Sequence, residues 1–196
     1  MKFLAFMRRY RWSLLIVAVA AAAWWPAVNY LADFRQPDVL FVTTPHDVVQ
    51  AMLDLAEVTE ADTVYDLGSG DGRVLRAAAE RGAKALGIEI NPELVDQSRQ
   101  MIRSAGLADK VTIRRGDIFK QDLRPATVIT MFLTKSLNSQ LRPQIDRLRP
   151  GTRLVSHVWS MPGAKPVKKV IVPSAEGRMD HTIYLWVTPI QWGEAE

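Results

Sequence analysis

The sequence contains no cysteine among its 196 residues. The chain therefore has no disulfide, no thiolate metal ligand and no cysteine nucleophile. Histidine is scarce as well, because only His46, His157 and His181 occur, and they are too scattered to give a metal-ligand spacing. We expect no metal site, while the cellular compartment stays open.

Excess charge is also lacking outside the N-terminal tail. Lys2, Arg8, Arg9 and Arg11 precede the first acidic residue, and without them 21 basic residues face 21 acidic ones. A nucleic-acid enzyme more often carries its excess positive charge on the folded body, so we expect no nucleic-acid partner. A basic tail beside a hydrophobic run is instead typical of a membrane surface.

One long apolar run follows the tail. Residues 12–32 are apolar apart from Ser13 and Asn29, and as a helix they would reach roughly 30 Å, about one hydrocarbon thickness. We predict that residues 1–32 are a basic tail and a single-pass membrane anchor. A cleaved signal peptide, with its cleavage site near Ala20–Ala23, and a buried or interfacial helix are the alternatives.

The remaining chain predicts a linker at residues 33–43 and one folded domain at residues 44–196. Thr44 is the expected N-cap of a first helix, with Pro45 at its first position and Asp47 completing a capping box. The expected strands cover residues 63–67, 84–90, 111–115, 126–132, 152–159, 167–172 and 182–187. Further helices are expected over residues 71–81 and 92–105, and through Leu137, Leu141, Ile145 and Leu148. This alternation predicts a parallel sheet with helices on both faces, and the last two strands predict an antiparallel edge.

The run "VYDLGSGDGR", residues 64–73, follows the first predicted strand. It is not a P-loop, because no Gly-Lys-Ser/Thr follows, and its G-x-G-x-G spacing differs from the dinucleotide fingerprint. Asp66 and Asp71 would repel pyrophosphate, whereas they suit an ammonium or sulfonium group. A tight turn that holds no ligand is the alternative.

Two more acids follow the next strands. Glu89 lies 21 positions after Gly68, close to the spacing of a carboxylate that binds ribose hydroxyls. Asp117 comes just after the third strand, where it could accept a hydrogen bond from an adenine amino group. Taken singly, Glu89 could be a surface acid and Asp117 a turn cap. Ribose, adenine and a cationic amino-acid tail together describe S-adenosylmethionine, the cofactor that we predict.

The motifs "VYDLGSGDGR", "GIEINPELV", "RRGDIF" and "LRPG" resemble those of the seven-stranded S-adenosylmethionine-dependent methyltransferases, over roughly residues 44–190. The N-terminal apolar segment, "VTTP", "FL" after the fourth strand and "RLVSH" are similar to a narrower group. That group is the membrane-anchored protein-lysine methyltransferases, whose mitochondrial members modify the ATP synthase c-subunit and the adenine nucleotide translocase. Phe41 stands where this family often has tyrosine. The resemblance implies an α/β, Rossmann-like seven-stranded sheet with an antiparallel edge hairpin, preceded by a hydrophobic N-terminal helix.

The resemblance also implies the cofactor site. Its expected members are Thr44, Asp66, Gly68, Ser69, Gly70, Asp71, Gly72, Glu89, Asn91, Asp117 and Ile118. The glycine backbone would cradle the methionine part and Glu89 the ribose, with Asn91 supporting that loop. Asp117 and Ile118 would flank the adenine, and residues 43–45 would close over the methyl end.

Phe132, Leu133 and Thr134, after the fourth strand, are the expected acceptor-positioning residues. Enzymes that methylate planar amide or exocyclic amino nitrogens often carry Asn/Asp-Pro-Pro-Tyr/Phe there, so this chain disfavours such acceptors. We expect methylation of a lysine on a membrane or membrane-associated protein. The alternatives are a lipid or quinone acceptor, and a membrane-anchored module that binds S-adenosylmethionine without catalysis.

The expected location contains a conflict. The N-terminal positive charges predict a cytoplasmic N-terminus, and a single span would then place the body outside. S-adenosylmethionine is made in the cytoplasm, so an external body would lack its cofactor. Either the charge rule is overridden, or the segment inserts without crossing fully, or the protein does not methylate. We predict that the catalytic body lies on the cytoplasmic face.

Overall fold

The computed structural model describes residues 41–193, which lie within the compact unit Gln36–Glu196. Seven strands form one sheet in the order β3-β2-β1-β4-β5-β7-β6. The strands are β1 (Thr63–Leu67), β2 (Lys84–Glu89), β3 (Val111–Arg115), β4 (Val128–Met131), β5 (Arg153–His157), β6 (Lys168–Ser174) and β7 (Met179–Val187). The helices are α2 (His46–Leu55), α3 (Arg73–Glu80), α4 (Pro92–Ser104), α5 (Lys135–Gln140) and α6 (Arg142–Ile145), with a short 3-10 helix η1 (Ile118–Lys120).

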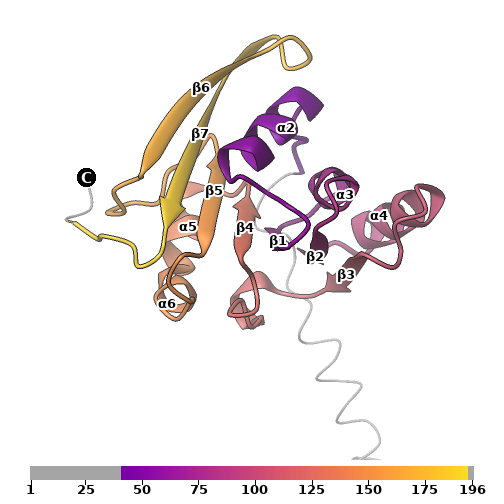
Figure 1. The fold of residues 1–196 in the computed structure, drawn as a ribbon, viewed down its shortest axis with the longest axis horizontal. Coiled ribbons are helices and arrows are strands. Elements are labelled where there is room, and N and C mark those ends of the chain that lie inside the picture. Colours follow the sequence, from indigo (N-terminus) through magenta and orange to yellow (C-terminus); the bar gives the residue numbers. More distant parts are fainter. Residues whose placement is uncertain (1–40, 194–196) are drawn as a thin grey trace, which may run out of the picture. The chain divides into compact units, whose positions relative to one another are not determined.

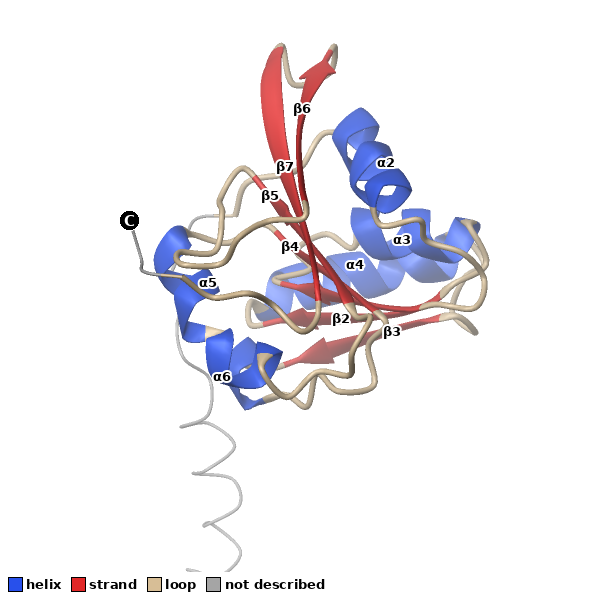
Figure 2. Ribbon diagram, turned by 60° about the vertical axis from the view of Figure 1, so that its left-hand side comes forward, coloured by secondary structure: helices blue, strands red, loops and turns tan. Residues whose placement is uncertain are grey.

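The strands from β3 to β5 run parallel, and β7 is antiparallel to both β5 and β6. Helices α2, α3 and α4 cover one face of the sheet, whereas α5 and α6 cover the other (Figure 1, Figure 2). The central strand β4 is covered on both faces and is therefore buried along its whole length. This confirms the predicted α/β Rossmann-like sheet with an antiparallel edge hairpin.

The predicted tail and anchor, residues 1–32, lie outside the described residues. Within residues 41–193, no helix is both long enough and apolar enough to cross a membrane.

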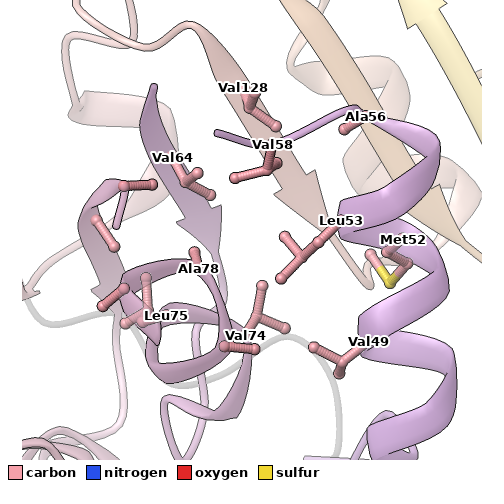
Figure 3. Packing of buried hydrophobic residues seen from close by; sticks show 14 of the residues in the cluster. Val49, Met52, Leu53, Ala56, Val58, Val64, Val74, Leu75, Ala78 and Val128 are labelled. Atoms are coloured by element: carbon pink, nitrogen blue, oxygen red, sulfur yellow. The ribbon is translucent and has the colours of Figure 1, made fainter. Parts of the chain in front are cut away.

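The core beside the site is packed between α2, α3 and the sheet (Figure 3). Val49, Met52 and Leu53 recur at helical spacing and bury one face of α2. That face packs with Val74 of α3 and Val64 of β1 in a single apolar cluster. Each buried aliphatic side chain of this size contributes roughly 1.5–3 kcal/mol, so the cluster fixes both helices on the sheet.

The β6–β7 hairpin projects beyond the parallel strands, and its tip is tied to the start of α2 (Figure 2). Asp47 accepts hydrogen bonds from Ser174 Oγ at 2.8 Å and from the Ala175 N–H at 3.1 Å. Glu176 in turn accepts a hydrogen bond from the His46 N–H at 2.8 Å. The carboxylate of Asp47 therefore binds the hairpin, and the capping box predicted for it is wrong.

Two further local predictions are wrong. Thr44 does not cap α2, because Pro45 occupies the N-cap position without a side-chain cap and the Thr44 hydroxyl bonds to His157. The single helix predicted across residues 137–148 is divided into α5 and α6. Pro143 has no N–H to continue the hydrogen-bond ladder, so a new short helix begins with this proline in its first turn.

Candidate active site

The carboxyl ends of β1, β2, β4 and β5 lie at one edge of the sheet, where open α/β folds bind their ligands. The glycine loop connects β1 to α3 at this edge. Its three glycines have φ values of 75° (Gly68), 52° (Gly70) and 84° (Gly72). A side chain would be strained at each of these left-handed positions, so the loop requires glycine and presents bare backbone.

Phe41 and Leu133 pack directly on this backbone. A Cβ atom added to Gly70 would collide with the Phe41 ring, and one added to Gly68 would lie 3.3 Å from Leu133 Cδ2. Residues 41–45, here called the strap, therefore pass over the glycine loop. Phe41 is 44% exposed although it touches the loop, so it lies at the rim of the site.

Glu89 ends β2 and is almost fully buried beside the loop. One carboxylate oxygen accepts the Gly70 N–H at 2.9 Å, and the other accepts the N–H groups of Ile90 and Asn91 at 2.8 Å each. A carboxylate offers about four acceptor positions, so one remains for a ribose hydroxyl. Glu89 thus also holds the glycine loop and the start of α4 together.

Asp66 lies near the end of β1, next to the loop, and is 5% exposed. Burial raises the pKa of Asp66 to about 7. This value already includes the hydrogen bond that Thr130 Oγ1 donates at 2.7 Å, which lowers the pKa, and the nearby carboxylates of Glu89 and Asp71, which raise it. A positively charged ligand would favour the ionised form, so this part of the site suits a cation.

Asp71 and Arg73 connect the loop to the strap. Arg73 donates to both carboxylate oxygens of Asp71, at 3.0 and 3.1 Å from Nε, and its Nη1 donates to the Thr44 carbonyl at 2.7 Å. Burial raises the pKa of Asp71, but the hydrogen bonds and the positive charge of Arg73 outweigh this effect. The pKa of this carboxyl therefore lies below its ordinary value. Asp71 is therefore occupied by Arg73 rather than open to a ligand.

The other predicted cofactor residues lie in local structural roles. Asn91 caps α4 by accepting the Glu93 N–H, and Asp117 caps η1 by accepting the Phe119 N–H, both at 2.9 Å. Ile118 is half-buried in η1. Ser69 Oγ is buried without a hydrogen-bond partner among residues 41–193, and it lies where a side chain on Gly87 of β2 would be. The roles of these residues toward a cofactor stay predictions.

The three predicted acceptor-positioning residues differ in their surroundings. Phe132 is half-buried, and its ring centroid lies 4.2 Å from that of His157. Leu133 is buried against Gly68, and Thr134 caps α5 by accepting the Leu137 N–H at 3.4 Å. Of the three, Phe132 is the residue whose ring packs against His157 at this edge.

A buried histidine pair completes the edge, and the sequence did not identify it. Thr44 Oγ1 lies 3.1 Å from His157 Nδ1, and His157 Nε2 lies 2.8 Å from His181 Nδ1. Burial and, as the smaller cause, the neighbouring His181 together lower the pKa of His157 to about 4. The "RLVSH" run placed His157 at a strand end, but its partners come from the strap and from β7, which only the folded sheet brings near.

These features fit S-adenosylmethionine. The glycine backbone leaves room for close approach, Glu89 keeps one acceptor position, and the buried Asp66 favours a positive charge. When bound, this cofactor supplies an electrophilic methyl group on a sulfonium centre. A doubly wound sheet with this site defines an S-adenosylmethionine-dependent methyltransferase.

Comparison with known proteins gives the family. The ANTKMT methyltransferase domain matches residues 66–168, and the chain belongs to this family. It is 42% identical over 154 residues to a protein-lysine N-methyltransferase from Saccharolobus islandicus, across 77% of this chain and 94% of that protein. It is 37% identical over 109 residues to the adenine nucleotide translocase lysine N-methyltransferase of Mus musculus, across 55% of this chain and 48% of that protein.

A similar solved structure contains the product of the cofactor. It is the crystal structure of an RNA methyltransferase from Salinibacter ruber in complex with S-adenosyl-L-homocysteine. The two chains are 45% identical with a TM-score of 0.71, across 76% of this chain and 94% of that one. The predicted cofactor and the predicted class of enzyme are confirmed.

Proposed function

We propose that this enzyme methylates the ε-amino group of a lysine on a membrane protein, with its catalytic body on the cytoplasmic face. The acceptor side of the site carries this proposal. Phe132 and the strap present aromatic and uncharged groups there, the buried His157 packs against the Phe132 ring, and the Thr134 hydroxyl is occupied by its helix cap. Such a surface suits an alkyl amine better than a planar amide or base, which needs several hydrogen-bond partners.

The relatives bear on the choice between lysine and RNA. The Saccharolobus and mouse proteins are named as lysine methyltransferases, whereas the Salinibacter protein is named as an RNA methyltransferase. Beyond the N-terminal tail this chain balances its basic and acidic residues, which gives no surplus charge for a phosphate backbone. We therefore favour lysine.

The uncharged surroundings also suit the chemistry. A lysine ammonium has an ordinary pKa near 10.4 and must lose a proton before its nitrogen can attack a methyl group. An apolar neighbour such as the Phe132 ring, with only the uncharged, buried His157 packed against it, disfavours the ammonium form. The chain then has to align amine and methyl group and exclude water.

The expected anchor bears on the choice of substrate. An anchor at residues 12–32 would confine the encounters of the enzyme to the plane of a membrane. Lysines of membrane proteins are the acceptors that such an enzyme would meet most often.

A labelled methyl-transfer assay tests the proposal. Full-length protein, S-adenosylmethionine with a labelled methyl group and membranes from a strain lacking the gene are incubated, with Glu89→Ala as the inactive control. We expect a discrete protein band that is sensitive to protease and contains methyl-lysine by mass spectrometry. Label removed by ribonuclease would identify an RNA acceptor instead, and label extracted by organic solvent a lipid or quinone.

A further inference from the structure

Neither histidine of the buried pair is among the predicted cofactor residues, and the pair contacts the strap and Phe132. His157 is 1% exposed and touches three separate segments, namely the strap through Thr44, β7 through His181 and the end of β4 through Phe132. A solely structural core position is more often apolar, because a buried polar ring costs free energy unless its nitrogens are paired. Here both ring nitrogens have a partner.

We propose that His157 is a positioning residue for methyl transfer, holding the Thr44 hydroxyl and the Phe132 ring where they define the place of the acceptor nitrogen. The inference rests on the lysine methyltransferase function proposed above and deepens it. His157 acts through Thr44 and Phe132, and His181 orients His157.

The hydrogen bonds favour one arrangement of protons. If His181 Nδ1 donates to His157 Nε2, the remaining proton of His157 is on Nδ1 and is donated to Thr44 Oγ1. The atom without a partner in the described part of the chain is then the bare His181 Nε2, which is buried. The opposite arrangement would bury an unpaired N–H, which native proteins tolerate less often than an unpaired acceptor. His157 thereby donates to Thr44 and holds its hydroxyl in place.

Thr44 is held at a second point, which couples the two sides of the site. Its carbonyl accepts from Arg73, which is bound to Asp71 of the glycine loop. The polar chain therefore runs from the cofactor loop through the strap to His157 and His181. Loss of His157 would release the strap on the acceptor side alone, and a displacement of about 1 Å at a reacting centre can cost roughly 100-fold in rate.

His157 is unsuited to act as the base. Its lowered pKa, about 4, lies far below that of a lysine ammonium, so it cannot hold the departing proton. The same property keeps the ring uncharged at neutral pH. An uncharged ring does not repel an incoming ammonium group, as a protonated ring would. Its contribution is therefore geometric.

The test compares two variants of His157. His157→Phe keeps a ring beside Phe132 but loses both nitrogens, whereas His157→Asn places an amide nitrogen close to the position of Nδ1, within reach of Thr44. His46→Asn, at an exposed histidine that is not hydrogen-bonded to His157, is the matched control. Initial rates are measured on the membrane preparation at saturating S-adenosylmethionine, and S-adenosylhomocysteine affinity is measured by calorimetry.

We expect His157→Phe to lower the maximal rate about 30-fold, with cofactor affinity and the half-saturating membrane concentration changed less than threefold. His157→Asn should recover at least a third of the wild-type rate, and His46→Asn should match the wild type. An unchanged rate in His157→Phe overturns the inference. An equal loss of rate and cofactor affinity in that variant also overturns it, because His157 would then be merely structural. If wild-type protein labels no protein at all, the proposed function itself fails and this inference falls with it.

Discussion

The two halves of the catalytic edge are built in different ways. In the cofactor half, formed by the glycine loop and Glu89, the buried Glu89 carboxylate accepts backbone N–H groups from the two residues that follow it and from Gly70 of the loop. In the acceptor half, formed by the strap, Phe132 and the histidine pair, uncharged side chains bind each other. Thr44 and His157 are separated by 113 positions.

This difference follows from what each half must bind. A cofactor with two positive groups is stabilised by fixed negative charge. An amine must be neutral to react, and surroundings without fixed negative charge favour its neutral form. The two halves meet at Arg73, which bonds to Asp71 on one side and to the Thr44 carbonyl on the other. Substitutions can therefore test whether the halves act separately.

The largest effect is expected at Glu89. Glu89→Ala removes the acceptor for three N–H groups and the position kept for ribose, so S-adenosylhomocysteine affinity should fall at least 100-fold, about 3 kcal/mol. Calorimetry measures this loss. Glu93→Ala, an exposed acid on α4, is the matched control and should bind normally. An affinity within threefold of wild type in Glu89→Ala would show that the cofactor half does not depend on this carboxylate.

A pH dependence of cofactor affinity is expected from Asp66. Its pKa of about 7 means that the carboxyl is ionised above pH 7 and protonated below it. A cationic cofactor favours the ionised form, so affinity should be full above pH 7 and fall up to tenfold for each unit below it.

Asp66→Asn should bind weakly and without this slope, which calorimetry from pH 6 to 8 would measure. Because ionisation of the buried Asp66 opposes folding as pH rises between about 4 and 7, the variant without cofactor should also melt at a higher temperature at pH 8. A wild-type affinity that is flat across this range contradicts the assigned role of Asp66.

A smaller effect on both halves is expected at Arg73. Arg73→Lys keeps the charge but loses the planar fork that bonds to Asp71 and Thr44 together. We expect the methyl-transfer rate to fall about tenfold and cofactor affinity about threefold, measured as above. Arg76→Lys on the exposed side of α3 should leave both unchanged. Loss confined to one half would show that the polar chain does not couple them.

The smallest effect is expected at the hairpin tip. Asp47→Ala removes the acceptor for Ser174 and Ala175, so backbone amides of the tip should exchange with solvent about three- to tenfold faster. Hydrogen exchange measures this change, with cofactor affinity as the unaffected reference. Protection that persists in Asp47→Ala would mean that β-pairing alone orders the tip.

The sequence predicted the local structure of the cofactor half, because the information for it is local, while the roles of its residues toward the cofactor stay predictions. The spacing of Gly68, Gly70 and Gly72 after a buried strand, and of Glu89 at the next strand end, is visible in a short stretch of chain. The seven strands were also placed correctly to within a few residues, since buried runs and alternation set them.

The acceptor half could not be predicted in this way. Thr44 has the residue type and position of a helix cap, and its bond to His157 depends on how β5 and the strap meet in three dimensions. The pairing of His157 with His181 likewise requires β7 to lie beside β5, which no local pattern states. The prediction of one continuous helix in place of α5 and α6 is a different error. The helical spacing of the apolar residues was given more weight than Pro143, which lacks an N–H.

Within residues 41–193, β3 and β6 are the two edge strands of the sheet, and β6 has no strand on its far side. An open edge of this kind can recruit a strand from another molecule and begin aggregation. Lys168 and Lys169 repel a second copy of the same edge, and Pro173 has no N–H to offer it. Replacing these residues with valine would leave an edge strand that can pair with a second copy of the protein. Three side chains with no part in the chemistry of the enzyme thus protect it from aggregation at this edge.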